Sequence, residues 1–298
     1  MAPLATAAQL VKPFEVFAAG AEATGTFEVG LRTALVRATG RRDADADPAL
    51  APLLADPRRY VQLFRPAPGG LQVVYDAGAL ERAITEGGGR LWPAERPVVL
   101  VVLGEVPAVA NLADIRALLE STALQRGLPI VIMTADAAGL PTGDTGTQSL
   151  LAAAARFEAD AVLAGQGVDA GVVDSWRWSL VTAASSESFV GGASDGIHGA
   201  TDALASTARE FMAQPELETW VEVSGVGSLR DYVAAERVLA GALGVDSVTL
   251  LEATGTTALF KVVARGGSGV LAGSLQGQTR LRAVAVDGPR LVYELLRD

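Results

Sequence analysis

The sequence predicts a mixed fold, α/β and α+β: a central α/β sandwich with a mixed sheet, flanked by two smaller α+β modules, the C-terminal one ferredoxin-like. First, half of the 298 residues are hydrophobic and only 19% are charged, so a sizeable core is available. Second, apolar runs at 98–103 and 128–133 are bounded by turn residues, as is typical of strands buried on both faces. Third, strands and helices alternate in the middle of the chain, which favours right-handed crossovers.

Residues 9–93 are expected to form the N-terminal α+β module. Apolar residues from Phe27 to Ala38 recur at helical spacing, and Gly40 stands where a helix C-terminal cap belongs. A polar, Pro-containing segment at 43–48 predicts a loop. The other expected elements are strands at 11–17, 60–64 and 71–75 and a helix at 77–86.

Residues 94–214 are expected to form the central sandwich. Asn111 is a good N-cap for a helix that ends at Arg126, because Gly127 follows it. A third apolar strand is predicted at 161–164 after an Ala-rich helix at 148–159. A hairpin at 176–182 and 187–190 then extends the sheet, and a helix at 197–212 closes the domain.

Residues 215–298 predict a ferredoxin-like βαββαβ module. Its expected strands lie at 220–226, 247–253, 257–264 and 281–286, and its helices at 229–243 and 270–275. Thr254, Gly255 and Thr256 are typical of a hairpin turn. A last strand at 291–295 is expected as an extra hairpin arm.

Composition excludes several kinds of chemistry. The chain has no cysteine, one histidine (His198) and two lysines (Lys12 and Lys261), so thiolate, two-histidine metal and most lysine-based sites are excluded. We therefore expect no cofactor and no metal. A net charge of −10 and a pI of about 4.7 argue against a nucleic-acid partner. No run reaches the roughly 18–20 apolar residues of a transmembrane helix.

The first residues predict an exported protein. Met1 to Ala8 resembles the tail of a signal peptide, because Ala5, Thr6 and Ala7 satisfy the small-x-small rule of a cleavage site. A periplasmic location is therefore expected. The alternative is a cytoplasmic protein with an ordinary Ala-rich terminus.

Two acidic patterns fail the requirements of their chemistry. Residues 144–147 read Asp-Thr-Gly-Thr, as in aspartic proteases, but that reaction needs a second such carboxylate and the chain has no second Asp-Thr-Gly or Asp-Ser-Gly. Asp43, Asp45 and Asp47 have the spacing of a calcium loop, but Pro48 stands where that loop needs glycine. A loop and a solvated acidic segment are the expected assignments.

Two glycine patterns fail by context. Gly165-x-Gly167 with Ala170 matches the letters of a dinucleotide fingerprint, but a hairpin rather than a helix is expected to follow. Residues 192–196 match the G-x-S-x-G elbow, but that motif requires a parallel strand before it. We therefore assign no catalytic residue.

A candidate interaction surface remains in the central segment. Trp176 and Trp178 fall on one strand face and predict either a stacking platform or core packing. Ser194, Asp195 and His198 follow two glycines and predict either an exposed polar site or the start of a helix.

Carboxylates also flank a tryptophan in the C-terminal segment. Glu216, Glu218 and Glu222 surround Trp220, which leaves open either a carboxylate pair or a solvated strand face.

Several phrases in a fixed order resemble the uncharacterised proteobacterial envelope family called domain of unknown function 2066, over roughly residues 11–250. They include residues 35–40, 60–62, 92–103, 126–129, 156–165 and 176–178. Such a resemblance implies an exported protein without an assigned reaction. The middle segment is also similar to the α/β domain of the curli-secretion lipoprotein and of the Tol-system translocation protein, which implies a partner-binding role in the periplasm.

The expected function is a non-catalytic binding or assembly protein of the cell envelope, with a protein partner. Two alternatives stay open: a hydrolase with an unrecognised carboxylate site, and a small-molecule sensor acting through the C-terminal module.

Overall fold

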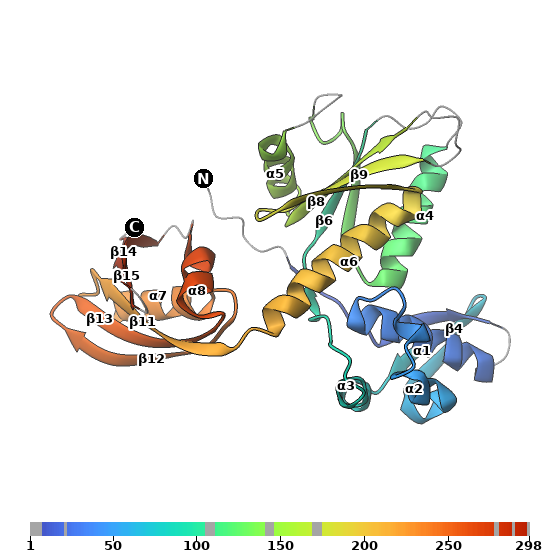
Figure 1. The fold of residues 1–298 in the computed structure, drawn as a ribbon, viewed down its shortest axis with the longest axis horizontal. Helices are drawn as coiled ribbons and strands as arrows, with labels where there is room; N and C mark the ends of the chain where they lie inside the picture. Colours follow the sequence, from blue (N-terminus) through green and yellow to red (C-terminus); the bar gives the residue numbers. More distant parts are fainter. Residues whose placement is uncertain are drawn as a thin grey trace. The chain divides into compact units, whose positions relative to one another are not determined.

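A computed structural model describes residues 8–20, 23–104, 111–140, 146–168, 175–276, 280–287 and 290–296. The chain divides into two compact units, residues 5–209 and residues 210–298. Each unit combines helices with strands, and two of the sheets contain both parallel and antiparallel pairs, so the mixed α/β class is confirmed (Figure 1). The predicted signal-peptide tail falls almost entirely on residues 1–7, which lie outside the described residues.

The N-terminal part of the first unit is a three-stranded antiparallel sheet in the order β2-β4-β3. Its elements are β2 (Glu15–Ala19), α1 (Ala23–Thr39), β3 (Val61–Ala67), β4 (Gly70–Tyr75) and α3 (Ala77–Glu86). Val16 and Ala18 of β2 are buried in one core with residues of α1 and α3, whereas Phe17 between them is 44% exposed. The alternation of a strand therefore leaves one face of this sheet open.

Short elements occupy the stretch between α1 and β3, of which the sequence predicts residues 43–48 as a loop. A 3-10 turn at Ala44–Ala46 is followed by α2 (Ala51–Ala55) and a second 3-10 turn at Pro57–Tyr60. These turns form because Leu50 and Leu53 are buried in the N-terminal core and hold the chain against it. Strands β1 (Gln9–Leu10) and β5 (Glu95–Arg96) form a further two-stranded ladder that the sequence does not indicate.

The central sheet has the order β10-β9-β8-β6-β7. Its elements are β6 (Val99–Leu103), α4 (Leu112–Arg126), β7 (Ile130–Thr134), α5 (Thr147–Arg156), β8 (Ala161–Gly167), β9 (Trp176–Val181), β10 (Ser186–Gly191) and α6 (Ala193–Met212). Strand β6 is parallel to β7 and β8, and the β9–β10 hairpin adds antiparallel strands, as predicted.

Helices cover both faces of this sheet in a three-layer arrangement (Figure 1). Val99, Val101 and Leu103 share a buried cluster with α4 and α6, whereas Leu100 and Val102 share another with α5. All five residues of β6 are buried, which explains its continuous apolar sequence.

Helix ends in the central domain follow the predicted capping chemistry. The Asn111 side chain accepts a hydrogen bond from the Ala113 amide at 2.9 Å, and Gly127 ends α4 in the left-handed conformation with φ 65°. Helix α6 begins at Ala193, four residues before its predicted start. Its first turn is held by Asp195, whose Oδ2 accepts the Gly192 amide at 3.0 Å.

The second unit is a five-stranded sheet in the order β12-β13-β11-β15-β14. Its elements are β11 (Glu216–Ser224), α7 (Leu229–Ala240), β12 (Val245–Thr254), β13 (Thr257–Arg265), α8 (Gly267–Leu275), β14 (Leu281–Asp287) and β15 (Arg290–Leu295). The predicted βαββαβ order is present, and β13 lies antiparallel between β11 and β12.

The position of the last strand corrects the prediction of an extra arm. Strand β15 lies inside the sheet, parallel to β11 and antiparallel to β14, which takes the edge. Leu291, Tyr293 and Leu295 of β15 are all buried in the core of this unit, and β15 has a neighbouring strand on each side. Strand β14 suits an edge because a bulge falls at Val284, which is 60% exposed.

Candidate functional site on the C-terminal sheet

The two tryptophans of the predicted platform lie in the core. Trp176 and Trp178 are 1% and 0% exposed, and their rings stack with centroids 5.4 Å apart. The Trp178 indole nitrogen donates to the Gly192 carbonyl at 3.1 Å. The core-packing alternative therefore describes these two residues, because no ring face is open to a ligand.

Trp178 also explains the glycines of the two rejected motifs. A Cβ at Gly165 would lie 2.3 Å from the Trp178 ring, and a Cβ at Gly196 would lie 2.4 Å from it. Both positions need glycine because β8 and α6 press against the same indole. The next described element after β8 is the antiparallel strand β9, as the expected hairpin requires. Ala170 lies outside the described residues.

Asp195 and Ser194 sit in the first turn of α6, and both are half-buried. Asp195 accepts a hydrogen bond from the Gly192 amide, and its Oδ1 atom lies 3.5 Å from Nη1 of Arg42. The helix-start alternative therefore accounts for Asp195. Ser194 is in the same turn without being part of a nucleophile elbow, because β10, which precedes it, is antiparallel to β9.

His198 faces an arginine that joins three helices. The Nδ1 atom of His198 lies 3.1 Å from Nη1 of Arg126. The other terminal nitrogen of Arg126, Nη2, donates to Asp202 at 2.5 Å and to the Gly40 carbonyl at 2.7 Å. Because arginine only donates, Nδ1 accepts and the imidazole is neutral in this arrangement. Burial, with Arg42 and Arg126 nearby, lowers the pKa of His198.

Buried arginines form a second polar feature that the sequence does not single out. Arg96 donates to the Arg37 carbonyl at 2.6 Å and to the Gly127 carbonyl at 2.7 Å, and its guanidinium lies 3.9 Å from the Trp92 ring centroid. Burial, and then Arg37, lower the pKa of Arg96 to about 9. These contacts join the C-terminal ends of α1 and α4, where the helix dipole favours a cation, so their role is structural.

The acidic segment at 43–47 is also structural. Arg41 binds Asp43 at 3.1 Å and Asp47 at 2.5 Å. Within the described ranges, no group of three or more His, Cys, Asp or Glu side chains could hold a metal ion. Residues 141–145, which include Asp144 of the protease-like pattern, lie outside those ranges.

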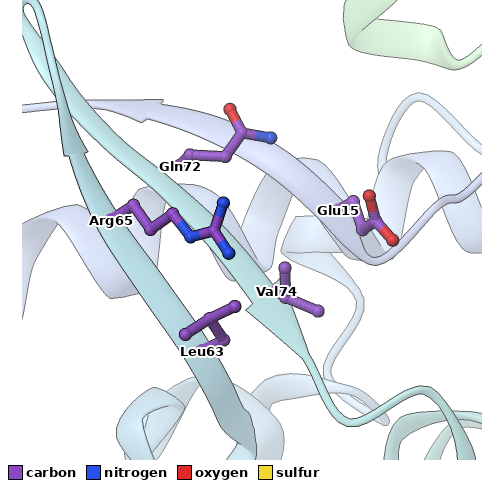
Figure 2. Close-up of a pocket in the computed structure, with 5 residues that line it drawn as sticks. All are labelled: Glu15, Leu63, Arg65, Gln72 and Val74. Carbon is purple, nitrogen blue, oxygen red and sulfur yellow. The ribbon is translucent and has the colours of Figure 1, made fainter.

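The open face of the N-terminal sheet carries a small hollow. Figure 2 shows its lining on the three strands: Glu15 on β2, Gln72 and Val74 on β4, and Leu63 and Arg65 on β3. Leu63 is 45% exposed, so the hollow is a shallow depression of the sheet surface.

The candidate site lies on the open face of the C-terminal sheet. Val221 and Val223 of β11 are buried against α7 and α8, so Trp220 and Glu222 point to the opposite, open face. Trp220 is 39% exposed, whereas the other three tryptophans of the chain are at most 3% exposed. We call this surface the Trp220 face.

Four charged side chains surround Trp220. Lys261 of β13 and Arg290 of β15 lie beside Trp220 on the flanking strands, and Glu218 and Glu222 lie two residues before and after it on β11. Lys261 binds Glu218 at 3.1 Å, and Arg290 binds Glu222. Farther along, Arg265 binds Glu216 at 2.5 Å, and Arg282 binds Glu294.

The sequence located the three glutamates that flank Trp220 but not their partners. These carboxylates hold cations of neighbouring strands, so they form a ladder of ion pairs across the Trp220 face. The partners are found only once the strand order is known, because Arg290 and Glu222 are 68 residues apart.

Comparison with known families matched the N-terminal part of the chain. A domain of unknown function (DUF8605) matches residues 16–93, which cover α1, α2, α3 and the sheet β2-β4-β3. The match fits an uncharacterised domain in this part of the chain, but the family is not the one that the sequence phrases resemble. No curated protein and no solved structure gave a significant match.

None of the described helices combines the length and the apolar character that a bilayer crossing requires.

Proposed function

We propose that this protein is a non-catalytic binding or assembly protein of the cell envelope, and that the Trp220 face is its binding surface. The observation that carries the proposal is the half-open indole of Trp220 at the centre of a sheet face, surrounded by four charged side chains. Tryptophan and arginine are both enriched at protein interfaces, where tryptophan gives a large rigid contact area and arginine gives several hydrogen-bond donors.

The rigidity of the Trp220 face supports a binding role. Trp220 stands on β11, which pairs over its length with β13 and on its other side with β15, so the backbone beneath the indole is held on both edges. Tyr232 of α7 stacks on Phe260 of β13 on the opposite side of the sheet at 5.7 Å. A surface built on such strands needs little ordering when a partner binds.

The envelope location is supported by sequence. The small-x-small residues near Ala7, the resemblance to the family called domain of unknown function 2066, and the similarity of the central segment to curli-secretion and Tol-system domains all favour an exported protein with protein partners.

Capture from an envelope extract tests the proposal. Immobilised full-length wild type is compared with Trp220→Asp, which alters the Trp220 face, and with Leu243→Asp, which alters a side chain 63% exposed elsewhere in the same unit. We expect the same bound protein with wild type and Leu243→Asp and its loss with Trp220→Asp. A protein that Trp220→Asp retains fully, or a turnover abolished by Ser194→Ala in a folded chain, would refute the proposed function.

A further inference from the structure

Three apolar side chains of the Trp220 face form one diagonal line, and Leu259 of β13, opposite Glu222, lies beside that line. In the register of the sheet, Val263 of β13 lies opposite Glu218, Trp220 lies on β11, and Val292 of β15 lies opposite Glu222. Each step along the line therefore moves one strand across and two residues along. Val263 and Val292 are half-buried and Trp220 is 39% exposed. We call these three residues the apolar stripe.

In each of two ion pairs the two partners lie on opposite sides of the apolar stripe, and the side that holds the cation differs between the two pairs. Between Val263 and Trp220, Lys261 lies on one side of the stripe and its partner Glu218 lies on the other. Between Trp220 and Val292, Glu222 lies on the first side and its partner Arg290 on the second. Each side of the stripe therefore carries one cation and one carboxylate.

This pattern is self-complementary. A two-fold axis along the apolar stripe exchanges its two sides, so it places a second Trp220 on Trp220 and each valine on its own copy. The same rotation places Lys261 over Glu218 of the copy and Arg290 over Glu222 of the copy. The three residues of the apolar stripe and the four charges around Trp220 then each meet a group of matching chemistry, as an isologous interface requires.

We propose that the occupant of the Trp220 face is a second copy of this chain, related by a two-fold axis along the apolar stripe. The inference rests on the proposed function and names its partner. Strands are about 4.8 Å apart and advance about 6.7 Å in two residues, so the stripe runs at roughly 35° to them and the two sheets cross at roughly 70°. This is near the orthogonal class of sheet packing.

The charges give the proposal a stringent test. The substitution Lys261→Glu would place a carboxylate against Glu218 of the copy twice in each dimer, whereas exchanging the two residues restores opposite charges both within and between chains. The variants are Lys261→Glu and the double variant Lys261→Glu with Glu218→Lys. Arg32→Glu is the control, because it reverses an exposed cation that binds Glu28 at 2.7 Å on α1.

Sedimentation equilibrium of the full-length chain over a wide concentration range is the first measurement. We expect a dimer for wild type, a dissociation constant at least about 10-fold weaker for Lys261→Glu, and near-wild-type values for the double variant and for Arg32→Glu. A wild type that stays monomeric throughout, or a dimer that Lys261→Glu leaves unchanged, would overturn the proposal. Recovery in the double variant also shows that the single variant fails by charge and not by misfolding.

Tryptophan fluorescence gives a second measurement. Because Trp220 is the one tryptophan with substantial exposure, quenching by iodide reports on it. We expect quenching to fall as wild type dimerises and to stay constant for Lys261→Glu. A monomeric wild type whose captured envelope protein is lost with Trp220→Asp would refute the dimer but keep the proposed function. A dimer insensitive to Trp220→Asp, with capture also insensitive, would refute both.

Discussion

His198 shows how one side chain combines packing with charge. It stands on α6 between Arg126 of α4 and Arg42, and the carboxylates Asp195 and Asp202 belong to its own helix. The neutral ring accepts a hydrogen bond from Arg126, whereas a protonated ring would place a second cation against two arginines. The residue is therefore a structural acceptor at neutral pH, and protonation opposes the folded state.

The lowered pKa of His198 predicts a loss of stability in mild acid. The unfolded chain takes up a proton near pH 6.5 and the folded chain only at lower pH, so stability is complete above about pH 6.5 and falls as the pH drops through the folded pKa. We expect the unfolding temperature of wild type to fall more between pH 7.5 and 5 than that of His198→Gln. Thermal unfolding measures it, and equal losses in the two proteins would contradict the assignment. His198 is the only histidine, so no other imidazole contributes.

At the scale of elements, the close approach of α6 to the central sheet depends on glycine. Trp178 fills the space beside Gly165 of β8 and Gly196 of α6. A side chain at either position has to displace a buried indole that is itself bonded to Gly192. Gly165 and Gly196, which belong to the two rejected motifs, are therefore needed for packing against Trp178.

Gly196→Ala is therefore expected to destabilise the protein, although alanine normally favours a helix. Forcing a methyl group against Trp178 costs about 1–3 kcal/mol of unfolding free energy. The control is Gly25→Ala in α1, where a Cβ meets no atom within 4 Å and a gain of up to about 1 kcal/mol is expected. Urea unfolding followed by circular dichroism compares the two, and a Gly196→Ala chain as stable as wild type would contradict the packing model.

Sequence predicted most of these elements because local signals determine them. The apolar run of β6, the Asn111 cap and the Gly127 end of α4 were all identified, since each depends on neighbouring residues. The inner position of β15 was not predicted, because strand order depends on pairing between distant segments, which local sequence patterns do not show. The burial of Trp176 and Trp178 was left open, because alternation identifies a strand face but not the helix that covers it.

The same limit applies to the candidate site. Trp220 and its flanking glutamates were visible as a local cluster, whereas Lys261 and Arg290 come from two other strands. Arg96 carries no local pattern either, because the two carbonyls by which it joins the ends of α1 and α4 lie 59 and 31 residues away in the chain.

At the scale of the whole molecule, each compact unit has its own core. The cluster around Phe260 draws only on residues of the second unit, whereas the clusters around Leu119, Leu100 and Leu31 belong to the first. Units with separate cores are expected to unfold as separate cooperative transitions.

Calorimetry of core variants tests this independence. Phe260→Ala removes a fully buried ring of the second unit and Leu119→Ala a fully buried side chain of the first, each at a cost of about 2–5 kcal/mol. We expect each variant to lower the midpoint of one transition and to leave the other unchanged. A single transition that both variants lower equally would show that the two units unfold together.

The inner position of β15 has a consequence for synthesis of the chain. Arg290 and Glu222 meet across a separation of 68 residues, and the parallel pairing of β15 with β11 closes a loop of that order. Such non-local pairing is slow to form, and it requires that β15 has already left the ribosome. A nascent or truncated chain that lacks β15 also lacks Arg290 and its ion pair with Glu222, so it does not present the complete Trp220 face.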